Sequence, residues 1–390
     1  MKKADMLRLI GSQVFLHATM AGCRLAAPLL ALQQGYSAAA VGLLVALFAV
    51  SQVFLALPAG RYADRHGLRR PVGIAVMASM LGAGMVAAFP TFEVMCMAAL
   101  VTGAATGTTV IALQRHAGRA ASDIGQLKEV FSWLAIAPAV ANFIGPFTAG
   151  MLIDHAGQVP ADLRAFRIAF GALAMSPLLC WWMVRTAPEM PRIAAPEGQG
   201  PLRAWDLLRE SMFRRLLFAN WMQSTCWDVH AFVLPILGHE RGIAASVIGS
   251  ILGAFAIAAA AIRIVLPRLT ANLPEARVIL WSSCGTAVLF AIYPFLTSPL
   301  AMGLCSVMLG FTLGSVQPMV MSMLHQITPH HRHGEALGLR LMTINASSVV
   351  MPMVAGSLGA VIGIGSVFWV FCGVMALGTQ VVRGLRLPPA

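Results

Sequence analysis

The sequence is poor in charge, and above all in acidic residues. Only 11% of its 390 residues are charged and just 15 are Asp or Glu, whereas 58% are hydrophobic. A soluble domain carries about a quarter charged residues, so a water-soluble globule of this composition would lack the polar side chains to cover its surface. A chain that faces lipid has no such need, because its helices satisfy their own backbone hydrogen bonds. The composition therefore excludes a soluble enzyme.

Other chemical signatures are missing as well. The seven cysteines lie in apolar runs, without disulfide or metal-ligand spacing, where cysteine acts as a small hydrophobe. No glycine-rich phosphate loop of the Walker type is present, which argues against direct use of ATP. The run His330–His333 has no cysteine or acid at ligand spacing before Glu335. We therefore expect neither a metal site nor a cofactor.

Apolar runs of about 20 residues, the length that crosses a bilayer, recur along the whole chain. They predict an all-α membrane protein with twelve transmembrane helices. The expected spans are 8–33, 39–60, 72–91, 94–114, 129–153, 165–185, 213–238, 243–267, 276–297, 300–326, 334–361 and 364–384.

The net charge of +12 indicates how these helices are oriented. Nearly all Lys and Arg fall in one alternate set of loops. Only Arg164, Arg167 and Arg241 lie in the other set, while Arg24 and Arg263 lie inside spans. By the positive-inside rule we expect a multi-pass protein of the inner (cell) membrane with both termini in the cytoplasm. Basic loop ends do not form the basic face that nucleic acid requires, so no such partner is expected.

The chain repeats itself once. A shift of 207 residues aligns Pro28 with Pro235, Gly35 with Gly242, Gly42 with Gly249, Phe48 with Phe255, Gly103 with Gly310 and Gly107 with Gly314. A shift of 206 residues aligns Glu129 with Glu335, Pro146 with Pro352 and Gly150 with Gly356. Matches in one order along one diagonal indicate two homologous halves.

The two halves are expected to form two pseudo-symmetric six-helix bundles. The N-terminal bundle is placed at 1–186, a proline-rich cytoplasmic linker at 187–212, and the C-terminal bundle at 213–390. In such a parallel repeat, solute binding is expected between the halves near the membrane midplane.

A basic loop between the expected second and third helices reads GRYADRHGLRR over residues 60–70. The chain resembles the major facilitator superfamily over its full length, and this loop is similar to that family's signature. The matching residues are Gly60, Asp64, Arg65, Gly67 and Arg69, while Leu68 stands where an arginine is usual. The resemblance implies transport by alternating access, with this loop latching the halves closed on the cytoplasmic side.

Each residue of the loop has an expected physical role. Gly60 allows a close helix approach, and Gly67 allows a turn of positive φ. We expect Asp64 at the positive N-terminal end of the eleventh helix, near residues 333–335. Arg69 is expected to pair with Asp123. The plain alternative is a basic turn that serves membrane topology only.

The expected fifth helix contains NFIGPFTAG over residues 142–150. Gly145, Pro146 and Gly150 are similar to the Gly-Pro-x-x-Gly-Gly signature of the family's drug–proton antiporters, with Ala149 replacing one glycine. The resemblance implies an exporter and a helix bent at Pro146, against the alternative of ordinary packing. Other residues usual in such antiporters, an arginine in the fourth helix and an acid in the first, are missing.

Two charges inside the spans are the sharpest functional candidates. Asp228 lies in the seventh helix and Arg24 in the first. We expect both to face one chamber at similar depth, because intramembrane charge is costly and usually functional. The alternative is a structural ion pair. Further candidates for the substrate or proton site are His17, Gln223, Trp227, His230, Asn142 and Gln317. Arg263 either binds substrate or extends to the membrane interface.

These observations predict a secondary active transporter. The first expectation is proton-coupled efflux of a small organic or amphipathic compound, and the alternative is uptake or exchange of an organic anion. A transporter-like membrane sensor is the alternative from another class. An enzyme is not expected, because no polar catalytic cluster lies at one membrane face. The expected partners are the small-molecule substrate, protons and the lipid bilayer, and the expected state is a monomer.

Overall fold

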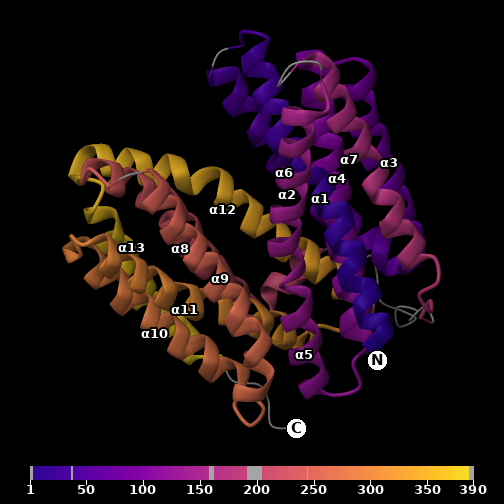
Figure 1. The fold of residues 1–390 in the computed structure, drawn as a ribbon. Coiled ribbons are helices and arrows are strands. Elements are labelled where there is room, and N and C mark those ends of the chain that lie inside the picture. Colours follow the sequence, from indigo (N-terminus) through magenta and orange to yellow (C-terminus); the bar gives the residue numbers. More distant parts are fainter. Residues whose placement is uncertain (1–2, 37, 158–161, 191–203, 244, 386–390) are drawn as a thin grey trace. The chain divides into compact units, whose positions relative to one another are not determined.

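The computed structural model describes residues 3–36, 38–157, 162–190, 204–243 and 245–385, and within these ranges its regular elements are helical (Figure 1). The long helices are α1 (Lys3–Gln33), α2 (Ala38–His66), α3 (Arg69–Ala88), α4 (Phe92–Ala120), α5 (Ile124–Leu134), α6 (Ala137–His155), α7 (Leu163–Val184), α8 (Ser211–Glu240), α9 (Ala245–Leu269), α10 (Glu275–Ile292), α11 (Pro299–Ile327), α12 (His333–Ile362) and α13 (Ser366–Arg383). Short 3₁₀ turns are η1 (Ala204–Arg209), η2 (Tyr293–Phe295) and η3 (His330–Arg332).

The expected spans correspond to these helices. Among the described residues, 11 helical segments are long and apolar enough to cross a membrane, with α5 and α6 counted as one. The 30-residue helix α8 occupies the place of the expected seventh span. The expectation of an all-α membrane protein is confirmed. Residues 191–203 of the expected linker lie outside the described residues.

Polar side chains begin several of the helices. The side chains of Thr91, Asp123, Asp162 and Ser298 each accept a hydrogen bond from the amide three residues ahead, at the starts of α4, α5, α7 and α11. Such caps satisfy amides that have no partner inside the helix. Because Asp123 is the cap, α5 begins at Ile124, earlier than the expected start at 129.

The fifth expected span is broken. It consists of α5 and α6, which Ala135 and Ile136 separate. α6 continues through Pro146, and the predicted bend at that residue stays a prediction. The break lies beside Pro138 in the first turn of α6, where the missing N–H of proline removes a hydrogen bond to the preceding turn.

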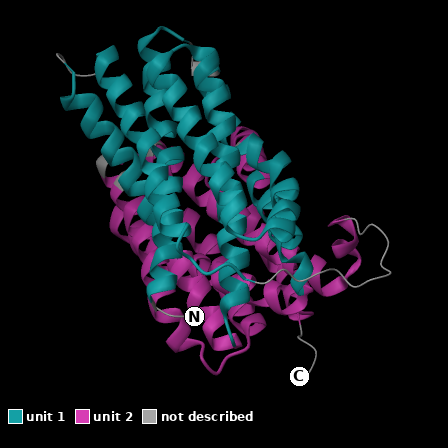
Figure 2. Cartoon of the chain, turned by 90° about the vertical axis from the view of Figure 1, so that its right-hand side faces the viewer, with its two compact units in different colours: residues 1–122, 136–200, 330–345 teal, residues 123–135, 201–329, 346–390 magenta. Residues whose placement is uncertain are grey.

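The helices form two compact units, shown in Figure 2. Unit 1 contains Met1–Ser122, Ile136–Gly200 and His330–Asn345, and unit 2 contains Asp123–Ala135, Pro201–Pro329 and Ala346–Ala390. Each unit thus includes a helical piece from the other half of the sequence: α5 belongs to unit 2 and the beginning of α12 to unit 1. The expected bundle boundaries at 186 and 213 stay a prediction.

The core of unit 1 consists of apolar side chains from six helices. Phe166, Phe170 and Leu173 of α7 are among its buried members. Helices α2 and α4 approach closely, since a Cβ on Gly103 would collide with the carbonyl oxygen of Phe48. Glycine at this position therefore sets the α2–α4 distance.

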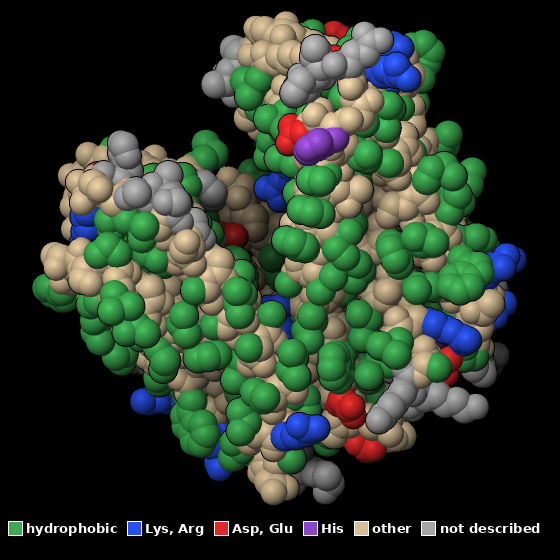
Figure 3. All heavy atoms as spheres, in the orientation of Figure 1, with side chains coloured by type: hydrophobic (Ala, Val, Ile, Leu, Met, Phe, Trp, Pro, Cys, Tyr) green, Lys and Arg blue, Asp and Glu red, His purple; other side chains and the backbone are tan. Residues whose placement is uncertain are grey.

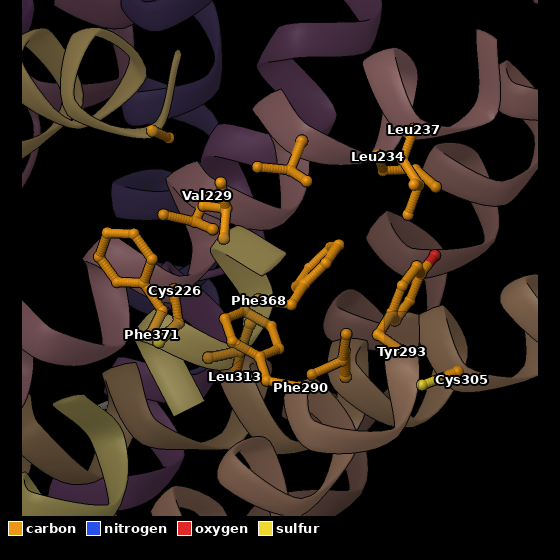
Figure 4. Close-up of a cluster of buried hydrophobic side chains, with 14 of the residues drawn as sticks. Cys226, Val229, Leu234, Leu237, Phe290, Tyr293, Cys305, Leu313, Phe368 and Phe371 are labelled. Atoms are coloured by element: carbon orange, nitrogen blue, oxygen red, sulfur yellow. The ribbon is translucent and has the colours of Figure 1, made fainter. Parts of the chain in front are cut away.

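The core of unit 2 contains more aromatic side chains than that of unit 1. Four of them, Phe290, Tyr293, Phe368 and Phe371, are labelled in the close-up of Figure 4. The ring of Phe368 lies 4.6 Å from that of Tyr293 and 5.1 Å from that of Phe290, measured between centroids. Here a Cβ on Gly310 would collide with the carbonyl oxygen of Phe255. The repeat pairs Gly103 with Gly310 and Phe48 with Phe255, so the same close helix contact occurs in both units.

Hydrophobic side chains cover much of the visible surface of the helices (Figure 3). Phe54 is 74% exposed and Leu377 is 69% exposed, and many other large apolar side chains are exposed as well. In water this surface would be unstable, whereas in a bilayer it contacts acyl chains.

Candidate functional site

The turn between α2 and α3 has the geometry that its glycine predicts. Gly67 adopts a φ of 77°. Over this turn, the carboxylate of Glu189 accepts hydrogen bonds from the amides of Leu68 (2.5 Å) and Arg69 (3.3 Å). The Arg69 guanidinium lies 3.6 Å from the same carboxylate and donates to the carbonyl of Ala187. Glu189, which the sequence analysis did not single out, therefore caps α3.

The carboxylate of Asp64 lies at the start of α12, as predicted. Its Oδ1 accepts from the amide of Gly334 at 2.9 Å, and its Oδ2 accepts from the amide of Glu335 at 3.1 Å. The Nε of Arg115 donates to Oδ1 at 2.6 Å. A negative charge at a helix N-terminus is stabilised by the free amides and the helix dipole.

Small residues make this approach possible. A Cβ on Gly60 would collide with the carbonyl oxygen of Gly334, and a Cβ on Gly334 would collide with that of Gly60. Beside this crossing, Glu335 accepts from Arg61 and from Arg332, both at 2.8 Å. We call Asp64, Arg115, Gly334 and Glu335, with Arg61 and Arg332, the Asp64 cluster.

Two other residues of the expected latch, Arg65 and Asp123, are not part of the Asp64 cluster. The side chain of Arg65 is exposed. Asp123 caps α5 through the amide of Gln126. Since Arg69 belongs to unit 1 and Asp123 to unit 2, their expected pairing stays a prediction.

Unit 2 contains a buried polar cluster that sequence reasoning missed. The ammonium of Lys128 donates to the carbonyls of Thr270 (3.2 Å) and Leu273 (2.8 Å), where α9 has ended, and lies 3.9 Å from the Glu275 carboxylate. Glu275 in turn accepts from the Ser322 hydroxyl and the Gln326 amide, both at 2.9 Å. We call these six residues the Lys128 cluster. A positive charge is favourable beside carbonyls at a helix C-terminus.

In unit 1, polar residues share one face of α1. Gln13, His17 and Arg24 lie four and seven residues apart, which places them on one side of a helix. Asn142 of α6 and Arg24 of α1 both lie near the ring of His17. The Oε1 of Gln13 and the Nδ1 of His17 are buried, and neither forms a hydrogen bond with a described group.

Glycine also brings α1 and α6 together. A Cβ on Gly145 would collide with the carbonyl oxygen of Ala18 and approach the amide of Gly22. Gly145 thus sets the α1–α6 distance beside Asn142, while Gly150 of α6 meets only ordinary contacts. This packing presents the α1 polar face beside α6.

In unit 2, the carboxylate of Asp228 is held by a neutral group. The hydroxyl of Ser348 lies 3.2 and 3.0 Å from its two oxygens. Next to it, the ring of Trp227 contacts that of Phe255 edge to face at 4.5 Å. One turn earlier in α8, the amide of Gln223 donates to Ser283 at 2.9 Å. Asp228 can therefore accept a proton without losing an ion pair in its own unit.

His230 has a different environment from Asp228. Its Nε2 lies 3.0 Å from the hydroxyl of Ser306, which also contacts the hydroxyl of Tyr293 at 2.8 Å. Its ring is 4.5 Å from that of Phe255. These contacts place His230 inside the aromatic core of unit 2.

Arg263 is buried rather than extended to the membrane interface. It is 7% exposed and donates to the carbonyls of Ala135 (2.5 Å) and Gly314 (3.2 Å). It also donates to Oε1 of Gln317 at 3.4 Å and lies 6.0 Å from the centre of the Trp227 ring. Of the two alternatives for Arg263, extension to the membrane interface does not agree with this burial, and substrate binding stays a prediction.

Arg24 and Asp228 belong to different units. Their expected placement across one chamber, and the substrate and proton roles of the residues around them, stay predictions.

Comparison with known proteins agrees with the helical architecture. The sequence model of the Major Facilitator Superfamily matches residues 9–218 and 216–390. A relative from Lactococcus lactis subsp. lactis (strain IL1403), named multi-drug resistance efflux pump PmrA homolog, is 25% identical over 335 residues, or 82% of this chain and 78% of that protein.

Solved structures share the fold at low sequence identity. A bacterial homologue of the iron transporter ferroportin, in an outward-facing state, matches with a TM-score of 0.81 at 15% identity, over 98% of this chain and 99% of that one. The human organic anion transporter MFSD10 (TETRAN) matches with a TM-score of 0.80 at 16% identity, over 98% and 100%. Together with the match to both halves, these findings place the chain in the Major Facilitator Superfamily, as a multi-pass membrane protein and non-enzymatic secondary transporter of a small molecule.

Proposed function

We propose that this transporter exports a small organic or amphipathic compound in exchange for protons. The proposal rests on Asp228, an acid inside a membrane helix whose carboxylate is bound by a neutral side chain. Asp228 lies in a membrane helix, where a charge costs at least about 2.5 kcal/mol, and its partner is the neutral hydroxyl of Ser348. A serine hydroxyl donates to a carboxylate and accepts from a carboxylic acid, so the pair persists in both protonation states.

The groups around Asp228 and on α1 suit an amphipathic substrate. Trp227, the sequence neighbour of Asp228, offers an aromatic ring that packs edge to face against Phe255. The α1 face offers a cation at Arg24 and buried polar atoms on Gln13 and His17 that have no partner among the described groups. Ligand sites commonly combine such apolar walls with a few polar atoms that fix orientation.

Two further observations support export. The relative from Lactococcus lactis carries the name of a multi-drug efflux pump. Gly145 and Pro146 in α6 are similar to the signature of drug–proton antiporters, and the close contact of Gly145 with α1 gives that signature a packing role.

In the proposed transporter the chain has a defined orientation in the membrane and a latch on its cytoplasmic side. Both termini lie in the cytoplasm, and the bundles 1–186 and 213–390, joined by the linker 187–212, work as a monomer. The Asp64 cluster then acts as a cytoplasmic latch, because its carboxylate joins α2 and α4 to the start of α12.

The test is transport by the purified protein in proteoliposomes with an imposed pH gradient. Hydrophobic organic cations and organic anions are screened as substrates. We expect gradient-driven transport of a compound by the wild type, and loss of that coupling in Asp228→Asn. Asp154→Asn, which alters an exposed acid of α6, is the matched control and keeps activity. Full gradient coupling in Asp228→Asn would refute the proton role.

Uptake or exchange of an organic anion is the second candidate, and Arg24 favours it. Its guanidinium lies on the same α1 face as His17, where it can bind a carboxylate. In this case Arg24→Gln abolishes transport of an organic anion without need of a pH gradient, while the exposed Arg167→Gln has no effect.

A further inference from the structure

The break in the fifth span leaves main-chain carbonyls without helical partners. In a continuous helix the amide of Ala139 would donate to the carbonyl of Ala135. Here that amide donates to Ile136 at 3.0 Å, as does the amide of Val140 at 3.2 Å. Pro138, which directly precedes Ala139, has no N–H and therefore donates no hydrogen bond to the preceding turn. The carbonyl of Ala135 is thus released from the helix.

A second carbonyl is released by another proline. Pro318 lies inside α11, and the carbonyl four residues before it belongs to Gly314. Because proline cannot donate, that carbonyl lacks its usual helical partner. Buried carbonyls without partners are costly, particularly in a membrane, where no water replaces the bond.

Arg263 of α9 donates to both of these carbonyls. Its Nη1 binds Ala135 and its Nε binds Gly314, while Nη2 reaches Gln317. The planar guanidinium, with five N–H groups, is suited to such divergent acceptors, and an ammonium is not. One side chain therefore completes the hydrogen bonding of two proline-disturbed helices.

The charge of Arg263 makes this arrangement sensitive to conformation. The partners of the guanidinium are neutral, and no carboxylate of a described residue lies within ion-pair distance of it. Its burial is therefore offset mainly by the two carbonyls and the Trp227 ring. If α5 moved away from α9, Arg263 and the carbonyl of Ala135 would lose the hydrogen bond between them, and the arginine would keep only its α11 partners.

We propose that Arg263 is a positioning residue for transport, which holds the fifth span in its broken form by tying α5 to α9 and α11. The break coincides with the place where the chain passes from unit 2 to unit 1, between Ala135 and Ile136. The arginine keeps α5 with unit 2, and the break acts as a hinge in the conformational cycle. This role is independent of the substrate.

Hydrogen–deuterium exchange of the peptide covering residues 133–141 tests the proposal without any transport assay. We expect Arg263→Gln to accelerate exchange in this peptide at least about tenfold, since a charged hydrogen-bond donor is lost. Arg263→Lys does not restore the slow exchange of the wild type, because an ammonium lacks the planar, forked donors of a guanidinium. Arg268→Gln, an exposed arginine of the same helix, is the matched control. Unchanged exchange in Arg263→Gln would overturn the proposal.

Pro138→Ala alone provides a second test, and this first measurement needs no arginine variant. With an N–H at 138, α5 and α6 can join into one helix, so exchange in the same peptide slows and the amide of Ala139 returns to Ala135. In that background Arg263→Gln has a smaller effect than in the wild type. Pro177→Ala, a helix proline in α7, leaves the peptide unchanged. Equal effects of Arg263→Gln in both backgrounds would contradict the hinge.

Transport kinetics then separate this role from substrate binding. In proteoliposomes, Pro138→Ala lowers kcat and leaves KM within about twofold, as expected when an interaction of the conformational step changes. A change in KM alone would show that the break acts on binding instead. Because the exchange measurements need no substrate, they hold even if the proposed proton-coupled export is wrong.

Discussion

The Asp64 cluster of unit 1 and the Lys128 cluster of unit 2 occupy nearly equivalent positions in the repeat. A shift of 206 residues carries Asp64 onto Thr270 and Lys128 onto Gly334, whereas the shift of 207 that aligns Phe48 with Phe255 carries Asp64 one residue further, onto Ala271. In unit 1 the amide of Gly334 donates to the carboxylate of Asp64, and in unit 2 the ammonium of Lys128 donates to the carbonyl of Thr270. In unit 1 the donor is a main-chain amide and the acceptor a side chain, whereas in unit 2 the donor is a side chain and the acceptor a main-chain carbonyl.

The difference shows what the repeat preserves. Helix packing fixes the place of the contact, whereas the local chemistry is free to vary provided that it suits the helix end concerned. A carboxylate lies at a helix start in one unit, and an ammonium lies beyond a helix end in the other. The supporting groups differ too, since Arg115 holds Asp64, whereas Ser322 and Gln326 hold Glu275.

Gly334→Val should have the largest effect on this comparison. A side chain at 334 meets the carbonyl of Gly60 and the carboxylate of Asp64, so the α2–α12 crossing must open. We expect a loss of about 3 kcal/mol or more in the free energy of unfolding, together with loss of transport. Gly373→Val, at a site with nothing within 4 Å, is the control in thermal unfolding. Equal unfolding temperatures for the two variants would disprove the close crossing.

Asp64→Asn should have the next largest effect. It leaves the buried Arg115 without its counter-charge and weakens the acceptors for two amides of α12. We expect a destabilisation of about 3 kcal/mol and a shift in the balance between the transport states. In the double variant with Arg115→Gln the effects should be less than additive. Unchanged transport and unchanged balance would refute the latch.

Lys128→Met should lower the free energy of unfolding by less than Asp64→Asn does. The carbonyls of Thr270 and Leu273 lose a donor, but Glu275 keeps Ser322 and Gln326. We expect about 1–2 kcal/mol, measured in the same unfolding assay. A larger loss than for Asp64→Asn would reverse the ranking, and would make the Lys128 cluster the more important of the two.

Arg65→Gln should have the smallest effect. Arg65 matches the family signature, but its side chain is exposed. We expect unchanged unfolding temperature and transport, because an exposed charge away from buried networks contributes little to stability. Loss of transport with normal insertion would show that the latch extends beyond the Asp64 cluster.

The residues that could be predicted are those whose role depends on their neighbours in the chain. The apolar runs predicted the helices, and Gly67 its turn of positive φ. The position of Asp64 at the start of α12 followed from the family resemblance. Glu189 gave no comparable signal, since its partners Leu68 and Arg69 lie about 120 residues away. The same holds for the pairing of Lys128 with Glu275, which joins groups far apart in sequence.

The sequence by itself determined a helical membrane protein with two homologous halves, because hydrophobicity and the spacing of glycines and prolines are local properties. Only the tertiary structure decided which groups Arg263 contacts. A single arginine in an apolar run has the same local signature whether it reaches the interface, binds a ligand or completes other helices. Which of these applies depends on the carbonyls that Pro138 and Pro318 release, and the fold brings those carbonyls to α9.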